Sequence, residues 1–344
     1  MLRKKKSVVG LDIGTKEIKA VELTDFGDSI KITGFGHCRL EVGDDVGARV
    51  NEILHDAGIK ARQVVTAVSG RSVIVRYITL PLMNDEELKG ALRYEADKYI
   101  PFEIDEVSID GQKLEDLEVQ AGAEEEMRVL LCAVKKDLIQ DHIQQVQETG
   151  LTPVVIDVDA FALGNAFELR NQNSPRVDDE DKVVALVDVG AVKTNINILR
   201  GTTSYFSREV YLGGDELTES IARQLHIDDE EAEELKRNPG DRETEICEAM
   251  GPTLDDLANE IHLSFDYFEN QFDREVGEVL ISGGCVNTPG LQETFERVFD
   301  RQVVNWDPTE NFELKGDRID IEDLRSYAAQ LPIAVGLGAR LLSL

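Results

Sequence analysis

Two Asp-x-Gly turns, far apart in the chain, carry the residues best suited to chemistry. Asp12 and Gly14 end one apolar run, and Asp188 and Gly190 end another. Glycine keeps such a turn tight and leaves its backbone N–H groups open to a polyphosphate. Carboxylates repel phosphate, but two of them on either side of a triphosphate could hold a hydrated Mg²⁺ ion. Neighbouring hydroxyl groups and a cation could assist at this predicted phosphate and metal site: Thr15, Thr194 and Lys16.

Two other segments have features of a nucleoside site. Gly283 and Gly284 follow the apolar strand 279–282, and their missing side chains would let a flat base or a ribose lie against the backbone. Glu233 and Lys236 are spaced by three and so share one face of a predicted helix, where they could hold a ribose. The alternative for Gly283 and Gly284 is a plain strand-to-helix loop, and the alternative for Glu233 and Lys236 is a surface ion pair.

The elements around the two turns repeat. Each turn joins two predicted strands, 8–13 to 18–23 in the first copy and 185–189 to 194–199 in the second. An apolar strand, a glycine turn and an alternating strand together predict a β-hairpin. Asp12 and Asp188 lie 176 residues apart, about half the chain, which indicates two related halves that face each other.

Two predicted helices carry small residues at a spacing of four. Ala160 and Gly164 lie in 157–170, and Ala334 and Gly338 lie in 331–342. Small side chains on one face would let the two helices approach closely, and ordinary core packing is the alternative. Between the hairpins, residues 36–149 contain both strand and helix patterns, which predicts a separate α+β insertion.

Composition excludes several classes of protein. The chain has 344 residues, with 37 Lys and Arg against 68 Asp and Glu, which gives a net charge of −31. We expect no nucleic-acid partner, because phosphate contacts need clustered basic residues. No apolar run approaches the roughly 18 residues of a membrane span, and no signal peptide is evident, so we expect a cytoplasmic protein. The four cysteines are scattered, which indicates neither a disulfide framework nor a zinc site.

The ordered motifs resemble the actin-like ATPase superfamily. They run through nearly the whole chain as GLDIGT, IDVDAFAL, LVDVGAVKTN, LGGDELT, AEELK, LISGGC and PIAVGLGARL. The resemblance implies an α/β fold of two RNase H-like halves, with ATP or ADP and Mg²⁺ in the cleft between them. Within the superfamily, the segments SVVGLDIGTKEIKAVEL and LPLMNDEELKGALRYEADKYIPF resemble the PilM family of type IV pilus assembly.

The resemblance also implies a subdomain layout. Subdomain 1A would comprise 1–35, 150–181 and the closing helix 326–344, and subdomain 1C would be the insertion 36–149. Subdomain 2A would comprise 182–213 and 276–325, and subdomain 2B would comprise 214–275.

Site residues carry over from the superfamily one by one. The phosphates and metal would face Asp12, Gly14, Thr15, Lys16, Asp188, Gly190 and Thr194, with Asp12 and Asp188 holding Mg²⁺ through water. The nucleoside would contact Gly213, Gly214, Glu233, Lys236, Gly283 and Gly284. Asp157 stands where relatives carry a glutamate that positions the attacking water, and its shorter side chain implies at most slow ATP hydrolysis.

The PilM resemblance implies an adaptor role at the inner membrane. The partner would be the cytoplasmic N-terminal tail of PilN, bound between subdomains 1A and 1C, and the β-rich segment 71–80 could accept it by strand addition. Contact with other pilus inner-membrane and motor proteins and self-association are further expectations, whereas the membrane would be reached only through PilN. The alternatives are an FtsA-like or MreB-like filament protein, the equivalent component of a type II secretion machine, and a sugar kinase that shares the fold.

Overall fold

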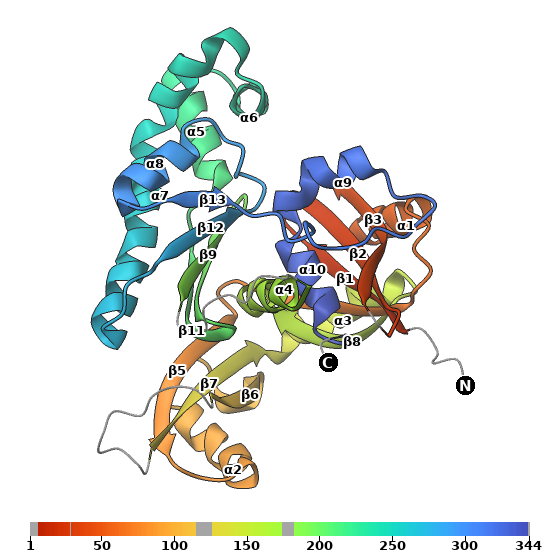
Figure 1. Ribbon diagram of the computed structural model, residues 1–344, viewed down its shortest axis with the longest axis vertical. Helices are drawn as coiled ribbons and strands as arrows, with labels where there is room; N and C mark the ends of the chain where they lie inside the picture. Colours follow the sequence, from red (N-terminus) through yellow and green to blue (C-terminus); the bar gives the residue numbers. More distant parts are fainter. Residues whose placement is uncertain (1–5, 28, 115–125, 174–181, 343–344) are drawn as a thin grey trace.

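Three β-sheets organise the protein. The computed structural model describes residues 6–27, 29–114, 126–173 and 182–342. These residues form two five-stranded mixed sheets and one three-stranded antiparallel sheet (Figure 1). The first two sheets carry the hairpins identified in the sequence, and the third belongs to the insertion.

The first sheet contains the first hairpin at its centre. Its order is β3-β2-β1-β4-β8, with antiparallel pairing from β3 to β1 and parallel pairing from β1 to β8. The Gly14 N–H donates to the Glu17 carbonyl at 2.9 Å and closes the hairpin turn. The strands are β1 (Lys6–Ile13), β2 (Glu17–Asp25), β3 (Ile30–Arg39), β4 (Gln63–Val68) and β8 (Thr152–Val158).

The second sheet repeats this plan. Its order β11-β10-β9-β12-β13 matches the first sheet strand for strand, with the same change from antiparallel to parallel pairing. The prediction of two related halves is therefore confirmed. The strands are β9 (Val183–Val189), β10 (Thr194–Arg200), β11 (Thr203–Val210), β12 (Glu278–Ser282) and β13 (Val303–Asn305).

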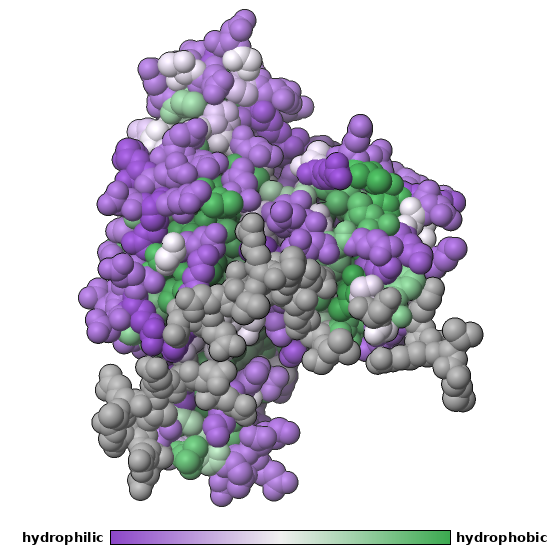
Figure 2. All heavy atoms as spheres, viewed as in Figure 1, coloured by the Kyte–Doolittle hydropathy of each residue, from purple (hydrophilic) through white to green (hydrophobic). Residues whose placement is uncertain are grey.

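Helices cover the outer face of the second sheet. Their apolar sides form one core with β9, β10 and β12, including Phe265, Phe268 and Phe295. On the face shown in Figure 2 the outer sides of these helices are mostly hydrophilic. The helices are α5 (Gly214–Leu225), α6 (Asp229–Arg237), α7 (Glu243–Phe272) and α8 (Leu291–Phe299), with the short turn η2 (Gly240–Arg242) before α7.

The two helices with small residues lie between the sheets. They are α4 (Asp159–Asn173) and α10 (Pro332–Ala339), and they share one core with strands of both halves. A Cβ atom on Gly336 would lie 1.8 Å from the Ala162 carbonyl oxygen, so the helix backbones nearly touch. The close approach is thus present, although it centres on Gly336 and Ala162, not on Gly338 and Gly164.

The insertion is smaller than the predicted 36–149 block. Its sheet β5-β7-β6 consists of β5 (Val73–Pro81), β7 (Glu126–Lys135) and β6 (Val107–Leu114), and it packs on α2 (Asp85–Ala96) near the turn η1 (Ile104–Glu106). The helices α1 (Val46–Asp56) and α3 (Lys136–Glu148) and strand β4 instead bury apolar side chains against β1 and β2. These elements belong to the first half, because the first sheet supplies their hydrophobic core.

The predicted segment 276–325 also divides between the halves. After β13 the chain crosses back to the first half, where Trp306 and Leu324 enter the shared core. Ile32 on β3 forms a parallel bridge with Leu314. The helix α9 (Ile321–Tyr327) and the turn η3 (Ala328–Gln330) then lead into α10.

Candidate functional site

A cleft of about 610 Å³ lies between the two hairpins. Both Asp-x-Gly turns contribute to its wall, together with residues of α4, α5, α6 and the loop after β12. Most of the predicted site residues line it: Asp12, Gly14, Thr15, Lys16, Asp188, Gly190, Gly214, Glu233, Lys236 and Gly284. The fold therefore brings together residues from both halves, as the repeat led us to expect.

Each hairpin presents an aspartate and a second polar residue directly opposite it. Lys19 pairs with Asp12 in the register of β1 and β2, and Asn195 pairs with Asp188 in the register of β9 and β10. Lys19 Nζ lies 3.3 Å from Asp12 Oδ2, whereas Asp188 Oδ1 accepts a hydrogen bond from Ser282 Oγ at 3.1 Å. Burial raises the pKa of Asp188 to about 6, and the neighbouring Lys19 only partly offsets it. Asp188 is thus the less neutralised of the two carboxylates.

A second buried lysine connects the halves at the cleft. Lys193 Nζ, from the turn of the second hairpin, lies 2.8 Å from Asp159 Oδ2 at the start of α4 and 2.8 Å from Glu209 Oε1 on β11. Glu209 also accepts the Gly70 N–H at 3.2 Å, just before the chain enters the insertion. Lys193 therefore joins Asp159 to Glu209, and Glu209 extends this connection to Gly70.

Three cleft-lining side chains have buried oxygen atoms without a protein partner among the described residues. They are Glu17 Oε2, Asn195 Oδ1 and Gln330 Oε1. An unpaired buried polar atom is costly, by about 1–3 kcal/mol, unless water or a ligand satisfies it. The cleft is therefore suited to a polar ligand.

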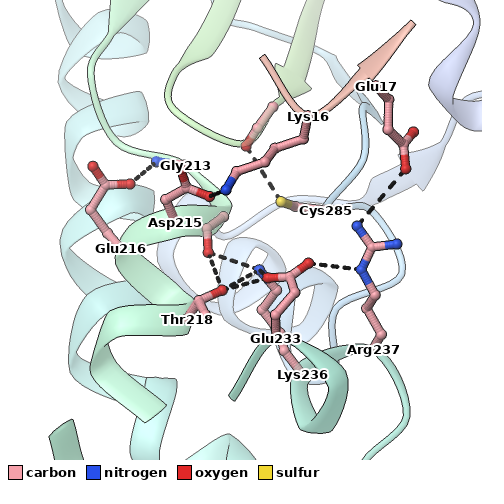
Figure 3. Close-up of polar contacts among 12 residues, drawn as sticks. Lys16, Glu17, Gly213, Asp215, Glu216, Thr218, Glu233, Lys236, Arg237 and Cys285 are labelled. Atoms are coloured by element: carbon pink, nitrogen blue, oxygen red, sulfur yellow. Dashed lines mark hydrogen bonds and ion pairs between the residues drawn. The ribbon is translucent and has the colours of Figure 1, made fainter. Parts of the chain in front are cut away.

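Lys16, about half exposed, lies 3.6 Å from Asp215 on the opposite wall (Figure 3).

Lys236 and Glu233 form a closed network in the wall of the cleft (Figure 3). Lys236 Nζ lies 2.8 Å from the Gly214 carbonyl oxygen, 2.7 Å from Thr218 Oγ1 and 2.6 Å from Glu233 Oε2. Burial opposes ionisation of Glu233, but hydrogen bonds from Lys236 and Thr218 outweigh it and lower its pKa to about 2. Because an ammonium group has three donors, Lys236 joins α6 to α5 and keeps none for a ligand.

Four predicted residues do not line the cleft. Thr194 is fully buried and its hydroxyl donates to the Leu212 carbonyl at 2.9 Å. Gly213 and Gly283 allow close backbone packing, because a Cβ would lie 2.6 Å from the Gly190 oxygen and 2.4 Å from the Val189 oxygen, respectively. Gly283 also has φ +98°, which favours glycine. These residues shape the wall without facing the cleft.

The fourth of these residues is Asp157, which we expected to be catalytic. It lies on β8, where its Oδ2 is 3.5 Å from Arg340 Nε and 3.3 Å from Asn165 Nδ2. Asp159, two residues later, lines the cleft instead. The strand ends at Val158 and α4 begins at Asp159, so the change of direction decides which aspartate faces the cleft.

Sequence reasoning missed several of the cleft residues. Lys19 and Asn195 each follow the turn aspartate of their hairpin by seven residues, so the hairpin register could have placed them opposite Asp12 and Asp188. Lys193 and Asp159 lie within the quoted motifs. Glu17 ends the turn of the first hairpin, directly after Lys16, so the same hairpin pattern could have indicated it. Gln330 had no comparable signal, because the turn η3 reaches the cleft only through the tertiary fold.

A family model for the type IV pilus assembly protein PilM matches residues 10–341. The chain belongs to the PilM family. A solved PilM–PilN type IV pilus biogenesis complex contains a chain that is 30% identical, with a TM-score of 0.84 over 97% of this chain and 98% of that one. This family membership confirms the predicted resemblance.

Other relatives agree with the actin-like fold expected for a PilM protein. The cell division protein FtsA of Bacillus subtilis is 24% identical over 263 residues, which cover 67% of this chain and 58% of FtsA. MreB5 of Spiroplasma citri bound to ADP shares the fold, with a TM-score of 0.54 at 10% identity, over 98% of this chain and 96% of that one. The predicted actin-like ATPase fold, with an insertion sheet, is therefore confirmed.

Two further features are absent from the described ranges. No helix there is long and apolar enough to span a membrane. Likewise, in that part of the chain no group of three or more His, Cys, Asp or Glu residues is arranged to hold a metal ion.

Proposed function

We propose that this PilM family member is a nucleotide-binding adaptor in type IV pilus assembly, on the cytoplasmic face of the inner membrane. ATP or ADP would occupy the cleft, and its presence would set the affinity for the N-terminal tail of PilN. The observation that carries the proposal is the cleft between two matching hairpins, in a chain that is similar over almost its full length to one in a PilM–PilN complex.

The cleft residues fit a nucleotide. The two turns line the cleft at Gly14 and Gly190, and the ammonium groups of Lys19 and Lys193 beside these turns suit phosphate groups. Unpaired buried oxygens of Asn195 and Gln330 call for donors that a hydrated ligand supplies. A bound Mg²⁺ ion would neutralise phosphate charge there. The ADP named for the MreB5 structure is consistent with this use of the fold.

Slow turnover is part of the proposal. Asp159 is the carboxylate at the start of α4 that faces the cleft, and Lys193 lies 2.8 Å from it. A carboxylate held by an ammonium group is a poor general base. We therefore assign no catalytic role to Asp157. We expect that a bound nucleotide changes partner affinity mainly by being present in the cleft and not by being hydrolysed.

The partner site would lie between the first half and the insertion. The solved PilM–PilN complex names the partner, and the net charge of −31 suits a basic tail. Strand β5 is an edge strand of the insertion sheet, but Tyr77 on it already contacts β11 through a 2.7 Å hydrogen bond to Ser204. Strand addition at β5 would therefore have to use the part of the edge away from Tyr77.

A binding titration tests the proposal. A labelled peptide with the PilN N-terminal sequence is titrated with the protein, with and without Mg-ATP, and fluorescent ATP is titrated separately. We expect saturable peptide binding at micromolar concentration or tighter, with an affinity that changes when ATP is present. Absence of peptide binding in both conditions would contradict the adaptor role. ATP-dependent polymer that pellets would instead favour an FtsA-like filament function.

A further inference from the structure

One edge of the first sheet is only partly covered by the protein's own chain. Strand β3 is the outermost strand at this edge. Near its start, the Ile32 N–H donates to the Glu313 carbonyl at 3.2 Å, and the Lys315 N–H donates to the Ile32 carbonyl at 2.8 Å. Residues 313–315 thus lie along the first part of the edge as a short added strand. Further along, at residues 35–39, no backbone group of the described residues pairs with the edge.

The pairing register identifies the backbone groups that are free at this edge. In an antiparallel pair, successive residues direct their N–H and C=O groups alternately toward the partner strand and away from it. The Leu40 N–H donates to the Lys16 carbonyl at 2.8 Å, so residues 34, 36 and 38 point toward β2. Phe35, His37 and Arg39 therefore direct their backbone groups to the open edge. Of these groups, the Arg39 carbonyl alone has a partner among the described residues, the side chain of an arginine on α1.

A groove of about 480 Å³ runs along the open part of the edge. Helix α1 forms one wall, and residues 318–327, which include α9, form the other. A Cβ on Gly36 would lie 3.0 Å from the Ile53 carbonyl oxygen, so α1 packs directly on the strand. Because helices stand on both sides, a single extended chain fits between them and a second sheet does not.

The groove is separate from the other sites. Figure 1 shows β3, α1 and α9 on the side of the first half that lies away from the insertion sheet. The proposed PilN site lies next to the insertion, and none of the residues that line the groove also lines the nucleotide cleft. An occupant of the groove would therefore be a further partner.

The wall formed by α9 is acidic and aromatic. Asp320, Asp323 and Tyr327 line it at spacings of three and four, as neighbours on a helix surface do. His37 stacks on the Tyr327 ring, with centroids 3.5 Å apart, and its Nε2 lies 3.1 Å from Asp323 Oδ2. Carboxylates beside an aromatic face favour a cationic side chain.

The arginines of the groove do not neutralise this wall. Arg49 is paired with Glu52 on α1, and Arg318 Nη1 donates to the His55 carbonyl at 3.0 Å. The groove has one more carboxylate than guanidinium groups in its full set of acidic and arginine side chains: Glu52, Asp56, Asp320, Asp323, Arg39, Arg49 and Arg318. The charge of the groove therefore suits a basic segment better than an acidic one.

We propose that the open edge of β3 binds an extended, basic segment of a partner protein by strand addition. Hydrogen bonds to the backbone of Phe35, His37 and Arg39 provide the affinity, and a lysine or arginine opposite His37 reaches the carboxylates of the α9 wall. An uncovered edge invites indiscriminate pairing, and the two helices beside this one restrict it to a single strand. The groove gives this PilM protein a second place for a partner, independent of nucleotide and of PilN.

Synthetic peptides test the proposal. The probe is a fluorescent peptide of about seven residues, a usual strand length, with alternating valine and threonine and a central lysine. It is titrated with the full chain, and we expect saturable binding that weakens when the central lysine is replaced by glutamate. N-methylation of every second backbone amide removes the donors on one side of the peptide. The two alternate methylation patterns should differ in affinity by about tenfold or more, because only one side of the bound strand faces β3.

Hydrogen exchange followed by nuclear magnetic resonance locates the bound peptide. The amides of Phe35, His37 and Arg39 should exchange quickly in the free protein and slowly with the probe bound. The amides of Gly36 and Cys38 already point toward β2 and should exchange slowly in both states.

The variant Asp323→Asn tests the α9 wall. It should weaken the lysine peptide by about two- to fivefold, the range of an exposed ion pair, and leave the glutamate peptide unweakened. Glu322→Gln is the matched control, because Glu322 is an exposed neighbour on α9 that does not line the groove. A purely structural effect of Asp323→Asn would weaken both peptides alike and lower the unfolding temperature.

Four results would overturn the assignment. Absence of lysine-peptide binding, or equal affinity for the lysine and glutamate peptides, would exclude a basic partner. Equal affinities of the two methylated peptides would exclude strand addition. Displacement of the probe by the PilN peptide would show a single shared site. Slow exchange of the Phe35 and His37 amides in the free protein, together with a concentration-dependent dimer in sedimentation, would show that a second copy of the chain covers the edge.

Discussion

At the scale of single residues, two carboxylates that line the cleft, Glu233 and Asp188, differ in how well their charge is paired. Glu233 is held by Lys236, Thr218 and Arg237, and its pKa is lowered to about 2. Asp188 is more deeply buried and, among the described residues, accepts a hydrogen bond only from the hydroxyl of Ser282, and burial raises its pKa to about 6. Burial of a charge is unfavourable unless it is paired, so Asp188 costs stability in the protein without ligand.

The first prediction is that Asp188→Asn stabilises the protein without nucleotide at neutral pH. Because the pKa of Asp188 rises from 3.8 to about 6 on folding, the native state binds more protons than the unfolded state between these values. Stability is therefore lost as pH rises through this window, and the loss is complete above it. A shift of this size corresponds to about 3 kcal/mol at most.

Chemical denaturation at several pH values measures this effect. The stability difference between Asp188→Asn and wild type should be near zero below pH about 4 and should grow until pH about 6–7. The exposed Glu219→Gln on α5 is the matched control and should show no such growth. A variant that is less stable than wild type at neutral pH would contradict the unfavourable burial of Asp188.

At the scale of elements, glycine positions decide how α10 fits between the sheets. Gly10 on β1 faces Ala334, where a Cβ would lie 1.9 Å from the carbonyl oxygen. Gly336 faces Ala162 on α4 at a similar separation. Because both neighbours are backbone atoms of packed elements, neither can move away as a side chain would. The α10 backbone is thus clamped between β1 and α4 beside the cleft.

The second prediction is that Gly336→Ala destabilises the protein by about 2–3 kcal/mol or more, as overpacking of a close contact does. Helix propensity alone would favour alanine, so the sign of the effect is diagnostic. Thermal or denaturant unfolding provides the measurement. Gly90→Ala is the matched control, because Gly90 lies within α2 with nothing near its missing Cβ, and it should gain about 1 kcal/mol. Equal effects at the two sites would refute a tight α4–α10 contact.

At the scale of the whole molecule, polar contacts connect the halves across the cleft. Lys16 faces Asp215 at 3.6 Å and Glu17 faces Arg237 at 3.8 Å (Figure 3). Lys193 also contacts Asp159. Strand β11 extends this connection to the insertion. Its Glu209 accepts the Gly70 N–H, and its Ser204 bonds Tyr77 on β5. A change around Lys193 can therefore reach the insertion through β11.

The third prediction concerns Glu209, which joins Lys193 to the first residues of the insertion. Glu209→Gln removes one of the two carboxylate charges that hold Lys193, the one on the side of the insertion, and we expect ATP then to lose most of its influence on PilN peptide affinity. Peptide titrations with and without Mg-ATP give the ratio to compare with wild type. Glu260→Gln is the matched control. Glu260, on α7, pairs at the exposed surface with Arg208, which lies on β11 next to Glu209. An unchanged ratio in Glu209→Gln would exclude this route.

Much of the fold could be read from local patterns. The repeat of an apolar strand, an Asp-x-Gly turn and a second strand predicted two hairpins and two related halves, and both sheets follow that plan. Turn chemistry and strand alternation depend on neighbouring residues, so they survive as signals in the sequence. The extent of the insertion could not be predicted from such local patterns. Strand β4 and helices α1 and α3 have strand and helix patterns of their own, but their apolar faces pack on the first sheet.

The sequence by itself determined the family, the two halves and the turns that meet at the cleft, because these follow from motifs and short-range periodicity. Tertiary structure alone decided that Asp159 faces the cleft while Asp157 contacts Arg340. It decided as well that the ammonium group of Lys236 is used up by neighbours in the cleft wall, Glu233 among them. It also decided that Asn195 keeps an oxygen without a partner among the described residues. The physical reason is that the partners available to a buried polar group come from elements far apart in the chain, and only packing brings them together or keeps them away.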